Sequence, residues 1–310
     1  MKRLPVITFI CGILFSSILA TGQQADSAKK VRSEMLVSTG WLADHAKDPN
    51  VVVLHVGDRM NDYKRGHIPG ARFLQYKTIA EDVNGVSVEL PPVERLQKVF
   101  SDLGIGDKTR VVIYTTSWQP DAARVWFTLD YLGHGENAAL LDGGIDQWLN
   151  ENRPVSGDSP KFSAATFTPR TNEKLRALLD EVKTVSDAKS DGTNAQILDA
   201  RPARRYTAGH ISGSTNIYWQ DTLVSEEKPV FQSPDKLQAL YAQRGIMPGK
   251  KVITYCEVGM QASHGFFLAK YLGYDAAMYD GSYSEWNSMK KMPVVMGEAK
   301  TAEAKTPESK

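Results

Sequence analysis

Hydrophobic and polar positions change period in a regular way along most of the chain. Short runs rich in β-branched residues, such as VVVLHV (51–56), RVVIY (110–114) and VITY (252–255), are typical of strands. Each is followed by a segment with a helical pattern, and amphipathic helices are predicted up to Tyr-Leu-Gly at 131–133 and again at 271–273. Strands that alternate with helices predict an α/β fold, with mainly parallel sheets, right-handed crossovers and helices on both faces.

The pattern occurs twice, at an offset of about 140 residues, which is too long for a solenoid unit. The matching pairs of segments are 51–73 with 195–217, 110–133 with 251–273, and 140–148 with 278–286. We therefore predict a duplicated domain, with domains at 23–153 and 170–296. The Ser-, Gly-, Asp- and Pro-containing segment 154–169 is the predicted linker. The tail 297–310 alternates Glu, Lys, Ala and Thr and is predicted to be disordered.

The bulk composition agrees with two domains and excludes one class of function. The chain has 310 residues, of which 42% are hydrophobic, enough for two cores. Its formal net charge is +1, and no cluster of Lys and Arg is present. This composition does not favour binding to nucleic acid.

The first 22 residues resemble a signal peptide. Lys2 and Arg3 precede a nearly unbroken apolar run, 4–19, and Ala20-Thr21-Gly22 places small residues where a signal peptidase cleaves. The alternative is an uncleaved anchor helix, for which the run is short. We expect cleavage after Gly22, export to the periplasm or beyond, and no stable membrane insertion afterwards.

Cleavage leaves a single cysteine. The sequence has two, Cys11 and Cys256, and Cys11 lies in the apolar run. Cys256 then has no partner for an internal disulfide, although exported proteins usually pair their cysteines or lack them. It is expected to be either a buried, inert residue or a functional one.

The two halves differ where one of their matching strands ends. After Ile113-Tyr114 the first half has Thr115, whereas after Thr254-Tyr255 the second has Cys256. Ligands of open parallel sheets bind beyond the carboxyl ends of the strands. The residues after Cys256 lead to a helix expected to begin near Ala262, with Gly259 supplying the freedom for a tight turn. Inward amides here predict an anion-binding nest and a lowered pKa for the thiol.

These segments resemble the rhodanese family of thiosulfate and 3-mercaptopyruvate sulfurtransferases. YCEVGMQASHGFFLAKYLGY followed by YDGSYSEW is similar to the family's active-site segment, and LDARPARRYTAGHISGSTN to the segment before it. The resemblance covers nearly all of residues 35–295, in both repeats. It implies two tandem rhodanese-like domains, the second of them catalytic.

The resemblance also implies an activity and its residues. A small anionic donor, thiosulfate or 3-mercaptopyruvate, would pass sulfur to Cys256, and the persulfide would pass it to cyanide or a thiol. Neither a metal nor an organic cofactor is implied. Arg205 corresponds to the arginine that faces the substrate, and Asp199 and Arg201 to a supporting pair. The implied substrate-binding loop consists of Glu257, Val258, Gly259, Met260 and Gln261.

The loop departs from both branches of the family. Thiosulfate-preferring members usually have basic residues after the cysteine and mercaptopyruvate-preferring members Gly-Ser or Gly-Thr, whereas this chain has Glu257-Val258. Asp58 and His67 match a relay of the mercaptopyruvate branch, but Val258 replaces its hydroxyl. We interpret His67, and His210 in the repeated Gly-His-Ile turn, as structural.

The sequence bears on three functions other than sulfur transfer. A related phosphatase needs an arginine at the end of its loop, where this chain has Gln261 and Ala262. The six histidines are scattered and do not predict a metal site. A periplasmic persulfide carrier or partner-binding module remains open, because it would use the same Cys256. The sequence leaves the oligomeric state open.

Overall fold

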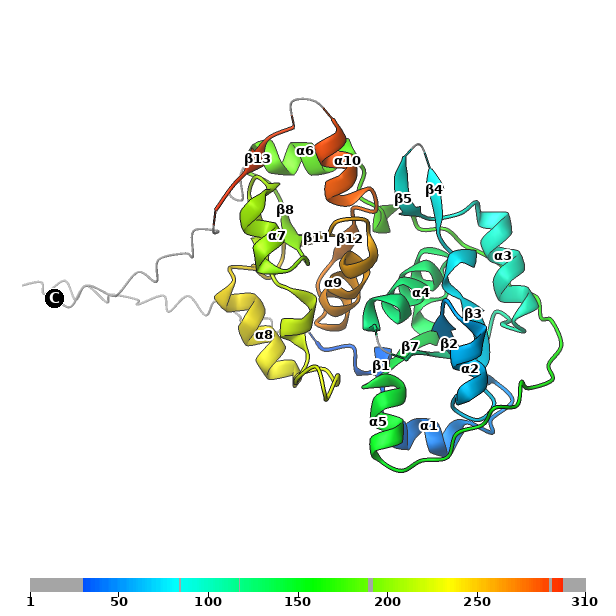
Figure 1. Ribbon diagram of the computed structural model, residues 1–310. Helices are drawn as coiled ribbons and strands as arrows, with labels where there is room; N and C mark the ends of the chain where they lie inside the picture. Colours follow the sequence, from blue (N-terminus) through cyan, green and yellow to red (C-terminus); the bar gives the residue numbers. More distant parts are fainter. Residues whose placement is uncertain (1–29, 84, 117, 189–191, 290–291, 298–310) are drawn as a thin grey trace, which may run out of the picture.

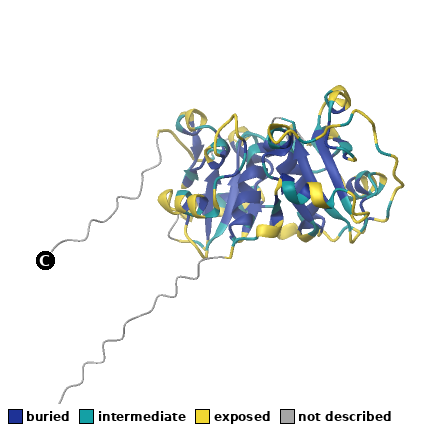
Figure 2. Ribbon diagram, turned by 90° about the horizontal axis from the view of Figure 1, so that it is seen from below, coloured by how far each residue is buried: buried dark blue, intermediate teal, exposed yellow. Residues whose placement is uncertain are grey.

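The computed structural model describes residues 30–297, apart from 84, 117, 189–191 and 290–291. The predicted signal peptide, 1–22, and the predicted tail beyond residue 297 lie outside these ranges. Across the described ranges, none of the helices combines the length and apolarity that crossing a membrane requires. Two α/β units lie side by side (Figure 1), with buried strands at the centre and exposed residues on the outer helices and loops (Figure 2).

The first unit is built on a parallel sheet with strand order β1-β7-β6-β2-β3. A separate antiparallel hairpin, β4-β5, projects beside the second unit (Figure 1). The strands are β1 (Leu36–Val37), β2 (Val51–Gly57), β3 (Arg72–Gln75), β4 (Glu81–Val83), β5 (Val86–Glu89), β6 (Arg110–Thr115) and β7 (Ala138–Leu141). The helices are α1 (Thr39–His45), α2 (Met60–Arg65), α3 (Val93–Asp102), α4 (Gln119–Tyr131) and α5 (Gly144–Asn150), with 3-10 turns at Ser33–Met35, Tyr76–Thr78 and Gly135–Asn137.

Helices cover both faces of this sheet because successive side chains of a strand point to opposite sides. Leu54 belongs to one apolar cluster, together with Phe100 of α3 and Trp126 of α4. Its neighbour Val53 belongs to another, which includes Leu42 of α1. The strands are therefore buried on both faces, which explains their unbroken apolar runs.

The second unit repeats this plan with strand order β10-β8-β11-β12, again all parallel. The strands are β8 (Ala195–Asp199), β9 (His210–Ile211), β10 (Ser214–Asn216), β11 (Lys251–Tyr255), β12 (Ala276–Met278) and β13 (Val294–Val295), where β9 and β13 form an antiparallel pair. The helices are α6 (Leu179–Ala188), α7 (Ala203–Ala208), α8 (Pro234–Gln243), α9 (Met260–Tyr271) and α10 (Ser282–Ser288), with 3-10 turns at Glu173–Leu175 and Trp219–Thr222.

The topology confirms the predicted duplication and the α/β class. Strands β2, β3, β6 and β7 occupy the same relative positions as β8, β10, β11 and β12. A single parallel bridge between Arg176 and Met278 stands where the first sheet has β1. Even the closing tryptophans match, since the indole N–H groups of Trp148 and Trp286 donate to the carbonyls of Pro154 and Pro293.

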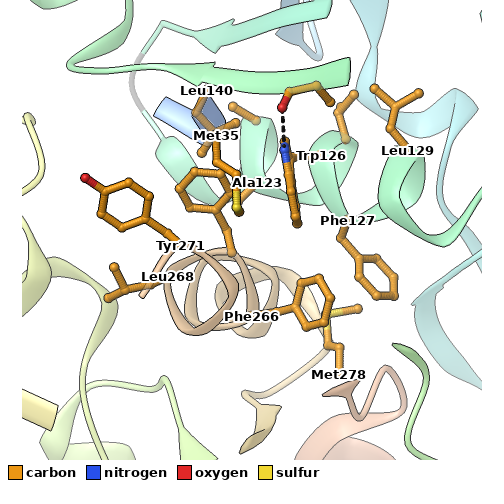
Figure 3. Packing of buried hydrophobic residues seen from close by; sticks show 14 of the residues in the cluster. Met35, Ala123, Trp126, Phe127, Leu129, Leu140, Phe266, Leu268, Tyr271 and Met278 are labelled. Carbon is orange, nitrogen blue, oxygen red and sulfur yellow. Dashed lines mark hydrogen bonds between the residues drawn. The ribbon is translucent and has the colours of Figure 1, made fainter. Parts of the chain in front are cut away.

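The two units share one apolar interface, formed by helices α4 and α9. Figure 3 shows Trp126 and Phe127 of α4 facing Phe266 of α9, with Phe127 and Phe266 ring centroids 5.1 Å apart at right angles. Both helices are buried on nearly every side. The prediction that they are amphipathic is therefore wrong, because each packs on its own sheet and on the other domain's helix. One apolar cluster runs through both units.

The segment predicted as a linker runs along the first unit and has neither helix nor strand. His67 and Ser156 exchange backbone hydrogen bonds of 2.9 Å, and Phe167 is buried against Phe100. These contacts hold the linker segment against the first unit.

Candidate active site

Cys256 directly follows β11, which lies between β8 and β12 in the second sheet. The chain then turns at Gly259, whose φ of 88° lies in the left-handed region that favours glycine. Helix α9 begins at Met260, two residues earlier than the sequence predicted. Met260 and Gln261 therefore form the first turn of the helix rather than a loop. The cysteine thus lies at the carboxyl edge of the sheet, as expected.

The backbone around Cys256 forms the predicted nest, but the pKa of the thiol is shifted in the direction opposite to the prediction. Amide groups of Val258, Gly259 and Ala262 donate toward its sulfur. The side chain is only 1% exposed, and this burial raises the pKa of the thiol, outweighing the amides. The expectation of a lowered pKa is wrong, because it counted the dipoles and left out the loss of solvent.

The first turn of α10, which follows β12, supports the backbone of the nest. Ser282 Oγ accepts the backbone N–H of Cys256 at 3.2 Å, and the N–H of Tyr283 donates to the Cys256 carbonyl at 3.0 Å. Glu257 is held in the same way, by the N–H of Ser284. These residues belong to the Asp-Gly-Ser segment found by the repeat, but their contact with Cys256 and Glu257 was not predicted.

The Asp199–Arg201 pair is buried at the base of the nest. Arg201 Nη2 lies 2.7 Å from Asp199 Oδ2, and its Nε donates to both carboxylate oxygens at 3.1 Å. The guanidinium is 2% exposed, donates to the Gly209 carbonyl, and stacks over the Tyr283 ring at 4.1 Å. These contacts agree with the structural role that we expected of the pair.

Glu257 points toward Arg201 and is 45% exposed. Its Oε2 lies 3.3 Å from Arg201 Nη1. The same guanidinium already pairs with Asp199, so it offsets only in part the negative charge that the sequence places beside the sulfur.

A pocket of about 280 Å³ opens over Cys256. Its walls are largely apolar, and Arg204 and Arg205 lie exposed in its lining. Among the described residues, neither arginine has an ion-pair partner. The lining residues are Trp118, Arg201, Pro202, Arg204, Arg205, Cys256, Glu257, Val258, Met260 and Gln261.

Most of the predicted residues come together here, and two others join them. Arg204, which the sequence did not single out, is exposed and lines the pocket beside Arg205. Trp118 comes from the first domain, immediately before α4. The repeat could have indicated it, because the start of α4 corresponds to the start of α9. Its distance from Cys256 in the sequence gave no reason to expect it in the same pocket.

Comparison with known proteins places this arrangement in a family. The rhodanese-like domain model matches the chain twice, over residues 38–151 and 179–289. The chain belongs to the rhodanese family. Together with its relatives, this makes the protein a sulfurtransferase with two tandem rhodanese domains.

Curated relatives match this rhodanese over nearly their whole length. It is 32% identical over 284 residues to the sulfur carrier protein TtuD of Thermus thermophilus, covering 86% of this chain and 98% of the relative. It is 31% identical over 281 residues to a putative thiosulfate sulfurtransferase of Mycolicibacterium smegmatis, covering 86% and 99%.

Solved structures share the same fold. SseA of Escherichia coli, described as a 3-mercaptopyruvate sulfotransferase, has a TM-score of 0.70 at 26% identity, covering 80% of this chain and 98% of SseA. The anaerobic ergothioneine biosynthesis enzyme of Chlorobium limicola has a TM-score of 0.74 at 22% identity, covering 86% of this chain and 71% of the enzyme, which shows the fold alone.

The first rhodanese domain does not bring its matching residues to the pocket. His67 is buried, with Nδ1 2.8 Å from the Tyr63 carbonyl and Nε2 3.1 Å from that of Asp158, and its ring stacks on Tyr63. His210 makes the equivalent contacts with Tyr206. Both histidines are structural, as predicted.

The possible relay of the mercaptopyruvate branch is not assembled around Cys256. Neither Asp58 nor His67 is among the residues that line its pocket. In the described part of the chain, no group of three or more His, Cys, Asp and Glu side chains is placed to hold a metal ion.

Proposed function

We propose that Cys256 is the nucleophile of this sulfurtransferase and carries the transferred sulfur as a persulfide. Its thiolate attacks the sulfane sulfur of thiosulfate, a sulfur–sulfur bond forms, and sulfite leaves with the electron pair of the broken bond. Cyanide or a thiolate then attacks the outer sulfur and releases the Cys256 thiolate. The observation that carries the proposal is a buried cysteine with three amides directed at its sulfur, at the floor of a pocket bearing arginines.

The nest suits the persulfide at least as well as the thiol. The outer sulfur of a persulfide is anionic and extends toward the pocket, where backbone N–H groups supply hydrogen bonds without a competing charge. Burial also keeps bulk water away from the reactive sulfur. The same geometry therefore supports both binding of the sulfur and its protection.

We propose that the donor is a small anion bound by Arg205, with Arg204 contributing to the same field. Both side chains line the pocket, and no described carboxylate pairs with either. The apolar walls, including Trp118 and Val258, accommodate an organic donor such as 3-mercaptopyruvate as well as thiosulfate. Replacing Arg205 by Ala is expected to raise KM for either donor more than it lowers kcat, with Arg204→Ala as the matched comparison. Equal KM values for Arg205→Ala and the unmodified protein would exclude this role.

The central test is turnover of the Cys256→Ser variant with thiosulfate and with 3-mercaptopyruvate, using cyanide as acceptor. We expect no turnover and no persulfide by intact-protein mass, together with an unchanged circular dichroism spectrum, since serine is similar in size. Thr115→Ser in the first domain is the control and is expected to retain activity. Persistent cyanide-dependent turnover in Cys256→Ser would rule out Cys256 as the nucleophile.

A persulfide carrier is the second candidate, favoured by the similarity to the sulfur carrier protein of Thermus thermophilus. A carrier would hold one sulfur per chain and pass it to a protein acceptor, with slow turnover on cyanide. Comparing the rate of persulfide loss to cyanide with multiple-turnover kinetics distinguishes the two. A fast single loss followed by little turnover favours the carrier.

We also propose that the protein is exported, on the sequence of residues 1–22. Mass spectrometry of the protein recovered from the periplasm is expected to find an N-terminus at Gln23. A retained Met1 or a cytoplasmic location would exclude this proposal.

A further inference from the structure

A buried ion pair joins the two domains directly behind the Cys256 loop. Arg124 of α4 is 0% exposed and Asp280, which follows β12 closely, is 3% exposed. The guanidinium binds both carboxylate oxygens, with Nη2 3.0 Å from Oδ2 and Nη1 bonded to Oδ1. A buried pair with two hydrogen bonds fixes the carboxylate in one orientation, because each charge needs the other in the absence of water.

Asp280 in turn occupies the space behind Gly259. A Cβ atom placed on Gly259 would lie 2.5 Å from Asp280 Oδ1, 3.0 Å from the Asp280 carbonyl oxygen and 3.4 Å from Arg124 Nη1. The turn at Gly259 directs the loop amides at the sulfur. The ion pair is therefore in contact with the residue whose backbone shapes the nest.

Arg124 also holds part of its own domain. Its Nη2 donates to the carbonyl of Val88 in the β4-β5 hairpin. Val88 has a φ of 73°, which is unfavourable for a β-branched residue and persists only where the surroundings determine it. One guanidinium thus links the hairpin and α4 of the first domain to the catalytic loop of the second.

We propose that Arg124 is a positioning residue, through which the first domain holds the Cys256 loop in its amide-inward conformation by way of Asp280. The first domain has Thr115 at the position that matches Cys256, and in this view it is nevertheless a working part of the site. The inference rests on the proposed role of Cys256. It assigns Arg124 no contact with substrate, since Arg124 is not among the residues that line the pocket.

The test measures the pH dependence of Cys256 alkylation by iodoacetamide in Arg124→Lys, Arg124→Met and Asp280→Asn. If the amides move away from the sulfur, the thiol pKa rises further, and we expect alkylation at neutral pH to slow about tenfold, one unit of pKa. We expect kcat to fall by a similar factor while KM for the donor stays nearly constant. This readout does not require sulfur transfer, so it remains valid even if the proposed function fails.

Other charged groups near the pair and the thiol must be separated from this effect. Glu89 faces the pair from β5, and burial raises its pKa to about 7. Tyr76 and Arg176 also lie close enough to influence this group of charges, while Asp199 and Glu257 act from the pocket side. Asp121 of α4 also has a pKa raised by burial to about 7, so Glu89→Gln and Asp121→Asn, each measured alone and combined with Asp280→Asn, remove these two carboxyl groups.

The matched control is Lys270→Met. Lys270 and Asp130 form another ion pair between α4 and α9, with Nζ 3.2 Å from Oδ2, away from the Cys256 loop. Its loss is expected to lower Tm and to leave the alkylation midpoint unchanged. If Arg124→Met fails to fold, the conservative Arg124→Lys and Asp280→Asn decide the matter. A folded Arg124→Lys or Asp280→Asn with an unchanged midpoint and kcat overturns the proposal.

Discussion

The two rhodanese domains share a sheet, helices and turns, yet they differ at the carboxyl edge of that sheet. Thr115 stands where Cys256 does, and His55, opposite Tyr114, stands where Asp199 lies opposite Tyr255. His55 is bonded to the Tyr114 hydroxyl at 3.1 Å, and burial lowers its pKa to about 4, so this position is neutral. The first domain therefore lacks a counterpart of the nucleophile. It also lacks a counterpart of Asp199, the carboxylate that anchors Arg201 in the second domain.

The two domains also differ in the charges on helices α2 and α7. Helices α2 and α7 correspond, and Asp62 takes the place of Arg205. Asp62 pairs with Arg59 and Arg65, whereas no described carboxylate pairs with Arg205. The same fold therefore forms with or without the site residues, because strand packing and the Tyr–His turns are independent of them.

The largest expected effect on activity comes from moving the cysteine from the second domain to the first. We expect Cys256→Ser to lose about a thousandfold or more of the activity, and Thr115→Cys added to it to restore none. The loop after Thr115 has no glycine, and Pro120 has no N–H to donate. Cyanide-dependent turnover checks this prediction. Restored turnover in the double variant would show that the loops are equivalent.

The next largest expected effect is on the pH dependence of the reactive thiol, which should differ between Cys256 and a cysteine placed at position 115. Because burial raises the pKa of Cys256, the thiolate fraction increases with pH through a midpoint above about 8.5, the value of a free cysteine. Alkylation at pH 7 is then expected at about one-thirtieth of its plateau rate or less. In Thr115→Cys/Cys256→Ser the new thiol lacks the amides, and its midpoint is expected to be higher still. A Cys256 midpoint below that of a free cysteine would contradict the burial argument.

Glycine at position 259 offers a smaller perturbation. Gly259→Ala introduces a left-handed alanine, at about 1–2 kcal/mol, and a clash with Asp280. We expect activity to fall about tenfold or more, with a lower Tm. Gly213→Ala is the control, since φ is 78° there and nothing lies within 4 Å of the added Cβ. Equal activity losses in the two variants would mean that only backbone strain matters.

The charge beside the sulfur has the smallest expected effect. Glu257→Lys is expected to raise kcat/KM for thiosulfate relative to 3-mercaptopyruvate by about fivefold, ~1 kcal/mol at a half-exposed site. The reason is that thiosulfate carries the larger charge, and added salt should reduce the gain. Steady-state kinetics at two ionic strengths check this prediction, with Glu226→Lys as an exposed control outside the pocket. An unchanged donor ratio would show that the charge at position 257 does not act on the bound donor.

The duplication, the strands and the location of the cysteine at a strand end could be predicted from the sequence alone. Strands such as 51–57 and 251–255 were predictable because β-branched residues buried on both faces give continuous apolar runs. The cysteine's place at a strand end followed from the same pattern. The Asp199–Arg201 pair was predicted from the resemblance to the rhodanese family, which implies a supporting Asp-x-Arg pair at these positions.

Features that depend on contacts between distant segments became visible only in the tertiary structure. Helices α4 and α9 are buried on nearly every side because the two domains pack against each other through them. The same packing brings Trp118 to the pocket. The pKa of Cys256 depends on how completely the fold excludes water, and the effect of Glu257 depends on Arg201, 56 residues away. Arg124 and Asp280 are 156 residues apart, and only the docking of the domains makes them a pair. Local patterns record secondary structure, whereas solvation and charge pairing are properties of the assembled fold.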